Sequence, residues 1–514
     1  MRLLLGLCLA AIAATLIAEE RPLRIEQDLA QGDLLLIEDG APLPAAIIQR
    51  SERKFTRQAY GPSFEGVGLH VAGGHHYHFT GLLQAADDDA CTVLGVHGQG
   101  TVLDFAGRWH SDGIYNFPHL ILRDGGHLRL SESATVDLVM ERDFFTRQLW
   151  VWGDGSGIIE LDEGFRADHS QATAVPVALG TIRLGGATLI THHSRSLPSH
   201  TRPDGRGGHY QNGHVVFERI PGNRWIVNSH NQVYRAQIDV DTDAVIETHA
   251  DLTHAGQRMQ ALPLPAGVHF TSSGAFRTTS PNVTITKTGP AMLALDGEQS
   301  YRPGASLVID EGLLRMATDP GLGRAANDAG PHLLLRITQE GRFHASAPSL
   351  QLRSIHLADS AHMWLDNRST LTVSEGLRVD TKATLHLAGT VNGSLHIEGT
   401  LAIDRRSGSA QIHDALQLDG TLDLRTGRQS SPLLSLHAGL SLGPQAKLRI
   451  RIPESSRDHP AKGSVLIAAN SAPHALAAWS GSIACSDDRW LLDIDIREGN
   501  LVLADFTELA PNQD

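Results

Sequence analysis

Residues 285–316 read ITKTGPAMLALDGEQSYRPGASLVIDEGLLRM, and this stretch decides the fold class. Its apolar side chains alternate with other residues in three short runs, with glycines between them. Alternation with a period of two predicts strands that turn one face to an interior, and glycine between strands predicts turns. The runs are Leu293/Leu295, Leu307/Ile309 and Leu314/Met316, and the glycines are Gly289, Gly297, Gly304 and Gly312. Strands this short need similar neighbours to form a stable sheet, so the pattern predicts stacked repeats.

The same stretch resembles the autotransporter-associated β-strand repeat. That repeat runs Lys-x-Gly-x-Gly-x-Leu-x-Leu-x-Gly, then Asn-x-Tyr-x-Gly, then Gly-x-Leu. The matching positions are Lys287, Gly289, Leu293, Leu295, Gly297, Tyr301, Gly304, Gly312 and Leu314. Ala291 replaces the second glycine and Gln299 replaces the asparagine. The resemblance covers one repeat only, and it implies a right-handed parallel β-helix of the kind found in bacterial secreted passengers.

Short alternations recur on both sides of this stretch and become dense downstream of residue 350. Their spacing fits three strands per coil of about 20 to 30 residues, hence roughly 15 to 20 coils over some 70 to 100 Å. We therefore expect an all-β chain, a right-handed parallel β-helix with an N-terminal cap and two loop insertions. A β-sandwich or a propeller would also contain many short strands, but the chain has few tight hairpin dipeptides. Leu293, Leu295, Leu307, Ile309 and Leu314 should line one aliphatic ladder.

The chain divides into four expected regions. Residues 1–18 resemble a signal peptide, with Arg2 before an apolar run, and a membrane anchor is the competing interpretation. Residues 19–75 would form the cap and first coils, with a short helix around 44–60, and residues 76–505 the parallel β-helix. Residues 506–514 would be a polar tail. The two loop insertions fall at residues 191–214 and 317–331.

Charge and hydropathy narrow the classes of partner. Cleavage of the signal peptide removes Arg2, so the formal charge changes from −14 to −15. This acidity argues against nucleic acid and anionic lipid as partners. No second apolar run approaches the roughly 18 residues that cross a bilayer, so we expect no transmembrane segment in the mature chain. We also expect no C-terminal translocator barrel, so the resemblance favours passenger architecture without self-export.

Cysteine usage offers a test of the architecture. Only Cys91 and Cys485 remain after the expected cleavage. Each coil of a solenoid touches only its neighbours, so residues near opposite ends cannot approach within bridging distance. The sequence therefore predicts two separate thiols, whereas a globular fold could pair them.

A row of acidic residues is the candidate catalytic site. Asp239, Asp241 and Asp243 alternate, and Glu247, His249 and Asp251 follow in the same phase if the strand continues. A glycoside hydrolase needs two carboxylates about 5 to 10 Å apart, and alternate residues on a strand lie about 6.5 to 7 Å apart. A polysaccharide lyase would instead need calcium or arginine together with a base. An acidic outward face without catalysis shows the same pattern.

Other polar clusters carry weaker signals. Imidazoles in the 191–214 loop could bind a metal, but their spacing follows no known ligand motif, and solvent-facing polar residues on a loop are the favoured interpretation. These candidates are His192, His193, His209 and His214, with a second histidine group at His75, His76 and His78. Asp87, Asp88 and Asp89 suggest an acidic turn, and Asp493 and Asp495 the outer face of a late strand. Trp150, Trp152 and Trp225 could stack on sugars or fill the core. No cofactor is indicated.

Two functions from different classes fit these patterns. The first is an exported, noncatalytic, adhesin-like scaffold of the bacterial cell envelope, located extracellularly, on the cell surface or in the periplasm. Its partners would be glycans or other cell-surface components. The alternative is a carbohydrate-active β-helix enzyme, a polysaccharide lyase or a glycoside hydrolase, that uses the acidic row.

Overall fold

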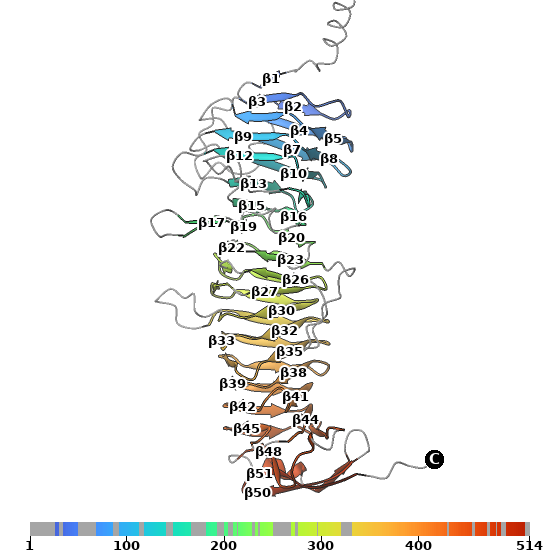
Figure 1. Cartoon of the computed structure of the whole chain (residues 1–514), viewed down its shortest axis with the longest axis vertical. Helices are drawn as coiled ribbons and strands as arrows, with labels where there is room; N and C mark the ends of the chain where they lie inside the picture. Colours follow the sequence, from blue (N-terminus) through green and yellow to red (C-terminus); the bar gives the residue numbers. More distant parts are fainter. Residues whose placement is uncertain are drawn as a thin grey trace, which may run out of the picture. The chain divides into compact units, whose positions relative to one another are not determined.

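In the computed structural model, most of the described residues lie in strands, and the chain forms two compact units (Figure 1). The first unit comprises residues 1–190 and 195–198, and the second comprises residues 191–194 and 199–514. The described residues are 26–29, 34–49, 68–85, 92–112, 118–139, 148–165, 181–192, 200–203, 209–212, 214–228, 232–234, 237–249, 269–272, 276–295, 297–319, 331–428, 431–454, 458–469, 473–479, 481–484 and 490–508.

Three parallel sheets form the first unit, and the chain visits them in rotation. The β1 sheet contains β1 (Glu26–Leu29), β3 (Ala46–Gln49), β6 (Leu82–Ala85), β9 (Arg108–Asp112) and β12 (Thr135–Val139). The β2 sheet contains β2 (Leu34–Ile37), β4 (Gly68–Val71), β7 (Val93–His97), β10 (His119–Arg123), β13 (Gln148–Gly153) and β15 (Thr181–Gly185). The β5 sheet contains β5 (His76–Phe79), β8 (Val102–Phe105), β11 (His127–Leu130), β14 (Ile158–Leu161) and β16 (Thr188–Thr191).

The second unit repeats this arrangement with strands of four parallel sheets. The β19 sheet contains β19 (His214–Phe217), β22 (Gln237–Val240), β25 (Phe276–Thr278) and β28 (Gln299–Ser300). The β20 sheet contains β20 (Asn223–Val227), β23 (Ala244–Thr248), β26 (Thr284–Thr288), β29 (Ser306–Ile309), β31 (Leu334–Ile337), β34 (Ser354–Leu357), β37 (Leu377–Val379), β40 (Leu395–Ile397), β43 (Leu416–Leu418) and β46 (Leu440–Leu442).

The other two sheets complete the coils of the second unit. The β21 sheet contains β21 (Gln232–Tyr234), β24 (His269–Ser272), β27 (Met292–Leu295), β30 (Leu313–Met316), β32 (Arg342–Ala345), β35 (His362–Leu365), β38 (Thr384–Leu387), β41 (Thr400–Asp404), β44 (Thr421–Arg425) and β47 (Lys447–Arg451). The β33 sheet contains β33 (Ser349–Leu352), β36 (Thr370–Val373), β39 (Thr390–Asn392), β42 (Ala410–Ile412), β45 (Leu434–Leu436) and β48 (Ser464–Ala468).

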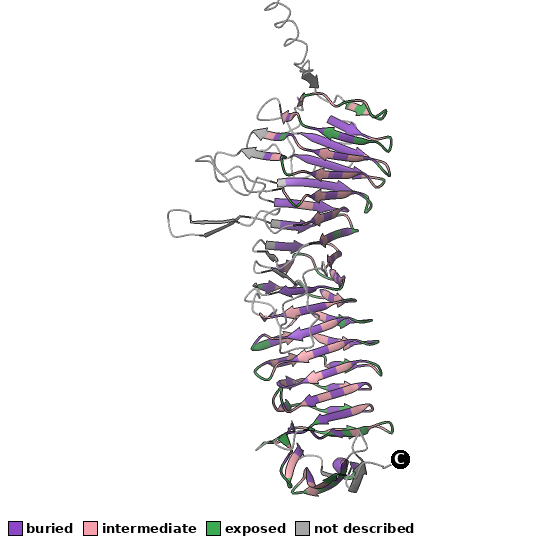
Figure 2. Ribbon diagram, turned by 45° about the vertical axis from the view of Figure 1, so that its right-hand side comes forward, coloured by how far each residue is buried: buried purple, intermediate pink, exposed green. Residues whose placement is uncertain are grey.

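The predicted parallel β-helix is confirmed. Along the strands, buried residues alternate with partly exposed ones (Figure 2), as expected when one phase of each strand faces the interior. Register partners in the β5 sheet, His76, Val102, His127 and Ile158, follow one another at intervals of 26, 25 and 31 residues. These intervals agree with the predicted coil length.

The stretch at 285–316 forms five strands, from β26 to β30. Leu293 and Leu314 are partners between β27 and β30, whereas Leu307 belongs to β29 in the β20 sheet. All the predicted inward residues of this stretch are at most 1% exposed. They line the interior as two ladders in different sheets rather than as one, because the chain turns a corner between consecutive strands.

Glycines close the corners of this coil. Gly289 and Gly312 have φ values of 77° and 70°, in the left-handed region that favours glycine. A Cβ atom on Gly289 would lie 2.3 Å from the Thr248 carbonyl oxygen, and one on Gly312 would lie 2.3 Å from the Gly289 carbonyl oxygen. Successive coils therefore approach so closely here that a larger residue would require the backbone to move.

Lys287 occupies an inward position that the alternation alone would give to an apolar residue. It is 0% exposed and lies in register between Ile246 and Ile309. Its Nζ donates to the carbonyl oxygens of Thr288 at 2.6 Å, Gly289 at 2.7 Å and Glu311 at 3.0 Å. Burial lowers the pKa of Lys287 to about 7, while the Glu311 charge raises it. The ammonium thus ties together the corners of two adjacent coils.

The C-terminal part departs from the expected architecture. The alternation pattern predicts a parallel β-helix up to residue 505, whereas β48 pairs antiparallel with β51 (Asn500–Glu508), which pairs antiparallel with β50 (Trp490–Arg497). β49 (Gly481–Ala484) adds a further antiparallel strand, and the short helices α2 (Pro473–Leu476) and η6 (Ala477–Trp479) precede it. Antiparallel strands joined by a tight turn close a sheet edge that another parallel coil would leave open.

Alternation on β50 has the predicted phase. Asp493 and Asp495 are exposed, whereas Leu492 and Ile494 are buried. The late strand is therefore correctly placed, but its neighbours run antiparallel. The expected tail also begins later, because β51 continues to Glu508.

At the other end, the described part of the expected cap already has strand structure. The prediction of a short helix around residues 44–60 is wrong over Ala46–Gln49, because these residues form β3, which pairs parallel with β1 and β6. Within the 191–214 loop, β17 (His200–Pro203) and β18 (His209–Asn212) form an antiparallel pair. The expected signal peptide at residues 1–18, Asp87 to Asp89, Cys91, Cys485 and residues 320–330 lie outside the described residues. No described helix is long and apolar enough to span a membrane.

Candidate functional site

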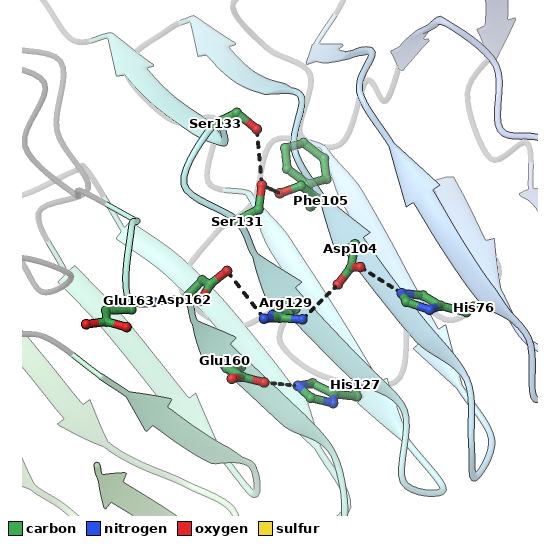
Figure 3. Close-up of polar contacts among 10 residues, drawn as sticks. All are labelled: His76, Asp104, Phe105, His127, Arg129, Ser131, Ser133, Glu160, Asp162 and Glu163. Carbon is green, nitrogen blue, oxygen red and sulfur yellow. Dashed lines mark hydrogen bonds and ion pairs between the residues drawn. The ribbon is translucent and has the colours of Figure 1, made fainter. Parts of the chain in front are cut away.

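A network of charged side chains lies on the outer face of the β5 sheet (Figure 3). We call it the charged face, and its residues are His76, Asp104, His127, Arg129, Glu160 and Asp162. Their apolar strand neighbours point inward: Leu103, Leu128 and Ile159 are all 0% exposed. The strand alternation therefore directs the charged residues outward.

Arg129 joins three coils of the charged face. Its guanidinium lies 4.0 Å from an Asp104 oxygen on one side and 3.4 Å from an Asp162 oxygen on the other. His76 contacts Asp104 at 2.7 Å and His127 contacts Glu160 at 2.9 Å. Figure 3 shows the Arg129 network beside the His127–Glu160 pair. Each carboxylate thus has a basic partner on a neighbouring strand.

This arrangement chiefly links coils. Cross-strand ion pairs on an exposed sheet each contribute roughly 0.2 to 1 kcal/mol. Asp104, Arg129 and Glu160 are consecutive partners in register, so the two carboxylate residues lie two strand spacings apart, about 9.6 Å between Cα atoms. That separation is near the upper limit for the carboxyl pair of an inverting hydrolase. Arg129 occupies the position between them, where a hydrolase would place the sugar and water.

The acidic row proposed from sequence does not form one continuous strand. β22 ends at Val240 and β23 begins at Ala244 in another sheet, so the expectation of one strand phase running from Asp239 to His249 is wrong. The intervening residues turn a coil corner. The sequence could not reveal this corner because Asp241 and Asp243 continue the alternation through it.

The three aspartates of the row contact the next coil. Asp239 is 8% exposed and accepts a bond of 3.1 Å from Arg277 Nε. Asp241 accepts from the Thr279 hydroxyl at 3.1 Å, and Asp243 accepts from the Thr284 amide at 2.7 Å. These contacts give the three residues roles in holding coils together.

Glu247 and His249 lie on the other side of the corner. Glu247 contacts both Arg224 and His249. Asp251 lies outside the described residues. The described members of the row therefore form separate contacts on two strands and the turn between them.

The histidine candidates are only partly described. His192 is partly exposed, His209 lies in β18 and His214 in β19, while His193 lies outside the described residues. Within the described part of the chain, no group of three or more His, Cys, Asp or Glu side chains is arranged to hold a metal ion. The second histidine group forms the start of β5, where His75, His76 and His78 are exposed.

The tryptophans proposed as sugar contacts are buried. Trp150, Trp152 and Trp225 are 5%, 6% and 0% exposed. Trp152 donates to His119 Nδ1 at 3.1 Å, and burial lowers the pKa of His119 to about 3. Trp225 donates to the Thr191 hydroxyl at 3.1 Å. Of the two interpretations offered for these tryptophans, the structure therefore supports packing in the core.

Trp364 is an outward-facing tryptophan that the sequence analysis above does not single out. It is the one tryptophan among the chain's seven, all of which are described, that is not buried. It follows the buried Met363 and precedes the buried Leu365 on β35, so its side chain points outward. The alternation in this tetrapeptide, His-Met-Trp-Leu, was the signal that could have identified it.

Two histidines pack around Trp364. The His386 ring stacks on the indole with centroids 4.9 Å apart and planes 1° apart, and the His362 ring lies 5.5 Å away. Burial lowers the pKa of His386 to about 4, and His362 lowers it further, against the opposing charges of Asp423 and Asp404. Burial and Arg342 also lower the pKa of His362. The lowered pKa values favour the neutral form of both imidazoles, in which each ring can donate and accept a hydrogen bond.

Comparisons of this chain with family models, with curated proteins and with solved structures find no match. The long parallel sheets establish a β-solenoid without assigning a family.

Proposed function

We propose that this chain is an exported, noncatalytic β-helix scaffold of the cell surface or extracellular space, adhesin-like in its mode of action. One observation carries the proposal: the carboxylates of the charged face and of the acidic row are engaged by partners on adjacent coils. Side chains used in this way hold coils in register, which is what a scaffold requires. The resemblance of residues 285–316 to the autotransporter-associated repeat supports the same role.

A carbohydrate-active enzyme is the second candidate. Asp104 and Glu160 lie in one register ladder, and this placement favours an enzyme. A glycoside hydrolase needs at least two carboxylates on one face. A catalytic acid would need to be free to give its proton to a leaving group. His127 contacts Glu160, and His76 with Arg129 contacts Asp104, so the scaffold role fits this face better.

Turnover assays separate the two candidates. Purified full-length protein is incubated with acidic and neutral polysaccharides, with and without calcium, and reducing ends and unsaturated products are measured. We expect no turnover from the wild type. Glu160→Gln should lower the free energy of unfolding of the first unit by about 1 kcal/mol or less, because it weakens the partly exposed ion pair with His127.

Glu163→Gln is the matched control for that substitution. Glu163 lies in an exposed turn of the same unit, so its replacement should have a still smaller effect. The enzyme proposal would replace the scaffold proposal if the wild type showed turnover that one carboxylate substitution abolished and Glu163→Gln did not. The substitutions tested are Asp104→Asn, Glu160→Gln and Asp241→Asn.

A further inference from the structure

The outer face of the β21 sheet from β32 to β47 differs in charge from the chain as a whole. We call it the Trp364 face. Its two central register ladders read Arg342, His362, Thr384, Thr400, Thr421, Lys447 and His344, Trp364, His386, Ala402, Asp423, Arg449. A third, shorter ladder reads Asp404, Arg425, Arg451. Aromatic, hydroxyl and cationic side chains therefore follow one another over successive coils.

Positive charge exceeds negative charge on this face. Five cations stand against two carboxylates, a formal excess of three, whereas the whole chain carries −14. Arg451 and Arg449 share the mostly buried Asp423, at 3.0 Å and 3.7 Å, and Arg425 lies 3.4 Å from Asp404. Lys447 is exposed and forms no ion pair with any described residue. The face thus offers cations to an anionic ligand that the rest of the protein would repel.

The aromatic stack ends at a small residue. Trp364 stacks on His386, and the next residue in the ladder is Ala402, which is only partly exposed. The centroid of a ligand ring at the level of Ala402 would lie about one strand spacing, 4.8 Å, from the His386 centroid, a normal centroid separation for stacked rings. The Trp364 indole N–H has no hydrogen-bond acceptor among the described residues. It remains available to a ligand hydroxyl or carboxylate.

Hydroxyl groups flank the same position. Thr384, Thr400 and Thr421 occupy the neighbouring ladder in three successive coils, and all three are partly exposed. Each hydroxyl can donate one hydrogen bond and accept others. The combination of one ring face, a row of hydroxyls and nearby cations matches a sugar ring that carries acidic substituents.

From these features we propose that the Trp364 face binds an anionic polysaccharide. One sugar ring packs over Ala402 against His386, its hydroxyls bond to Thr400 and Thr421, and carboxylate or sulfate groups pair with Lys447 and Arg449. The proposal rests on the scaffold function above and names its ligand class.

Two other polyanions fit this face less well. Single-stranded nucleic acid needs several exposed aromatic faces for its bases, and only one stack is present. An anionic bilayer favours exposed apolar side chains that can insert, and the large exposed apolar residues of the described chain, Leu34, Leu36 and Leu491, lie on other strands.

Binding of the full-length protein to four glycans tests the proposal. Heparin presents sulfates, alginate and polygalacturonate present carboxylates, and dextran is neutral. We expect one or more of the three anionic chains to bind and dextran not to bind. Lys447→Gln with Arg449→Gln should weaken binding at least about tenfold at low salt. It should also make the slope of log affinity against log salt shallower by about 1 to 2, since two cations no longer release counterions.

Two further variants separate local contacts from net charge and from misfolding. Arg302→Gln with Arg336→Gln removes the same charge from exposed positions outside the Trp364 face and should leave affinity unchanged. Ala402→Leu keeps every charge but fills the proposed ring position, so it should lower affinity about tenfold with an unchanged circular dichroism spectrum. Ligand should also change the fluorescence of the wild type, and Trp364→Phe should remove that change.

Several results would overturn the proposal. The proposal would be wrong if the double variant Lys447→Gln with Arg449→Gln bound the anionic glycan as tightly as the wild type does. It would also be wrong if the control variant Arg302→Gln with Arg336→Gln lost as much affinity as that double variant. Absence of glycan binding, or binding only to anionic phosphatidylglycerol vesicles or to poly(dT), would assign the face to another ligand or to none. A failure here leaves the scaffold function standing, because that function is tested by turnover.

Discussion

Leu307→Asp is expected to open the coils around β29, whereas Val308→Asp should leave them folded. Leu307 is 0% exposed and lies between Ile285 and Leu335 in the interior ladder, while Val308 is the next residue and faces outward beside Thr286 and Arg336. An unpaired carboxylate in the apolar interior costs several kcal/mol, about 4 or more, whereas the same group on the surface changes stability by about 0.5 kcal/mol.

Hydrogen exchange read by mass spectrometry checks this pair of variants. Coils of a solenoid depend on their nearest neighbours, so Leu307→Asp should remove protection from β26, β29 and β31 together. Val308→Asp should retain wild-type protection in the same peptides. Equal protection in the two variants would mean that the assigned inward and outward phases are incorrect.

Lys287→Met is expected to destabilise the second unit by about 2 to 4 kcal/mol. Methionine fills a similar volume but leaves three carbonyl groups at the coil corners without the ammonium donor. A buried polar group that loses its partner costs about 1 to 3 kcal/mol, and removal of the buried ammonium offsets part of that loss. The urea midpoint of the unfolding step that includes β26 to β30 measures the effect.

Lys447→Met provides the control for that substitution. Lys447 is an exposed strand lysine in the same unit, so its replacement should change the midpoint by no more than about 0.5 kcal/mol. An equal effect of the two substitutions would show that the carbonyl contacts of Lys287 contribute nothing to stability.

Period-two alternation was enough to predict the fold class and the inward residues. It assigned Leu293, Leu307 and Leu314 to the interior, because side-chain direction in a strand depends only on local sequence. It could not assign the antiparallel pairing of β50, since alternation looks the same in parallel and antiparallel sheets. Nor could the alternation show that the Lys287 side chain is buried rather than exposed. The carbonyl groups that accept its hydrogen bonds come from two coil corners, which only the structure brings together.

The outward faces were harder to predict than the interior. Asp104, Arg129 and Glu160 come together only when coil intervals of 25 and 31 residues are known, and these intervals depend on variable corners. The prediction that the acidic row continues along one strand was wrong for the same reason. In the sequence, the corner after Val240 looks like continued alternation. Trp364 could have been assigned outward from its neighbours, but its stacking on His386 required the register between β35 and β38.

The stacking of one coil per strand spacing is the central claim, and distances between spin labels test it most directly. Ser441 is the common position, paired in turn with Arg378, Arg336 and Thr286, which lie three, five and seven register steps away in the β20 sheet. Each position is replaced by a labelled cysteine, and the native cysteines are replaced by serine. At about 4.8 Å per step, the backbone separations are about 14, 24 and 34 Å.

Pulsed electron paramagnetic resonance should give three narrow distance distributions. Their centres should increase by about 10 Å from each pair to the next, because the label side chains add a similar offset to each. Distances that do not increase in this order, or that increase by unequal amounts, would contradict the stacked parallel coils on which the scaffold and its proposed glycan-binding face depend.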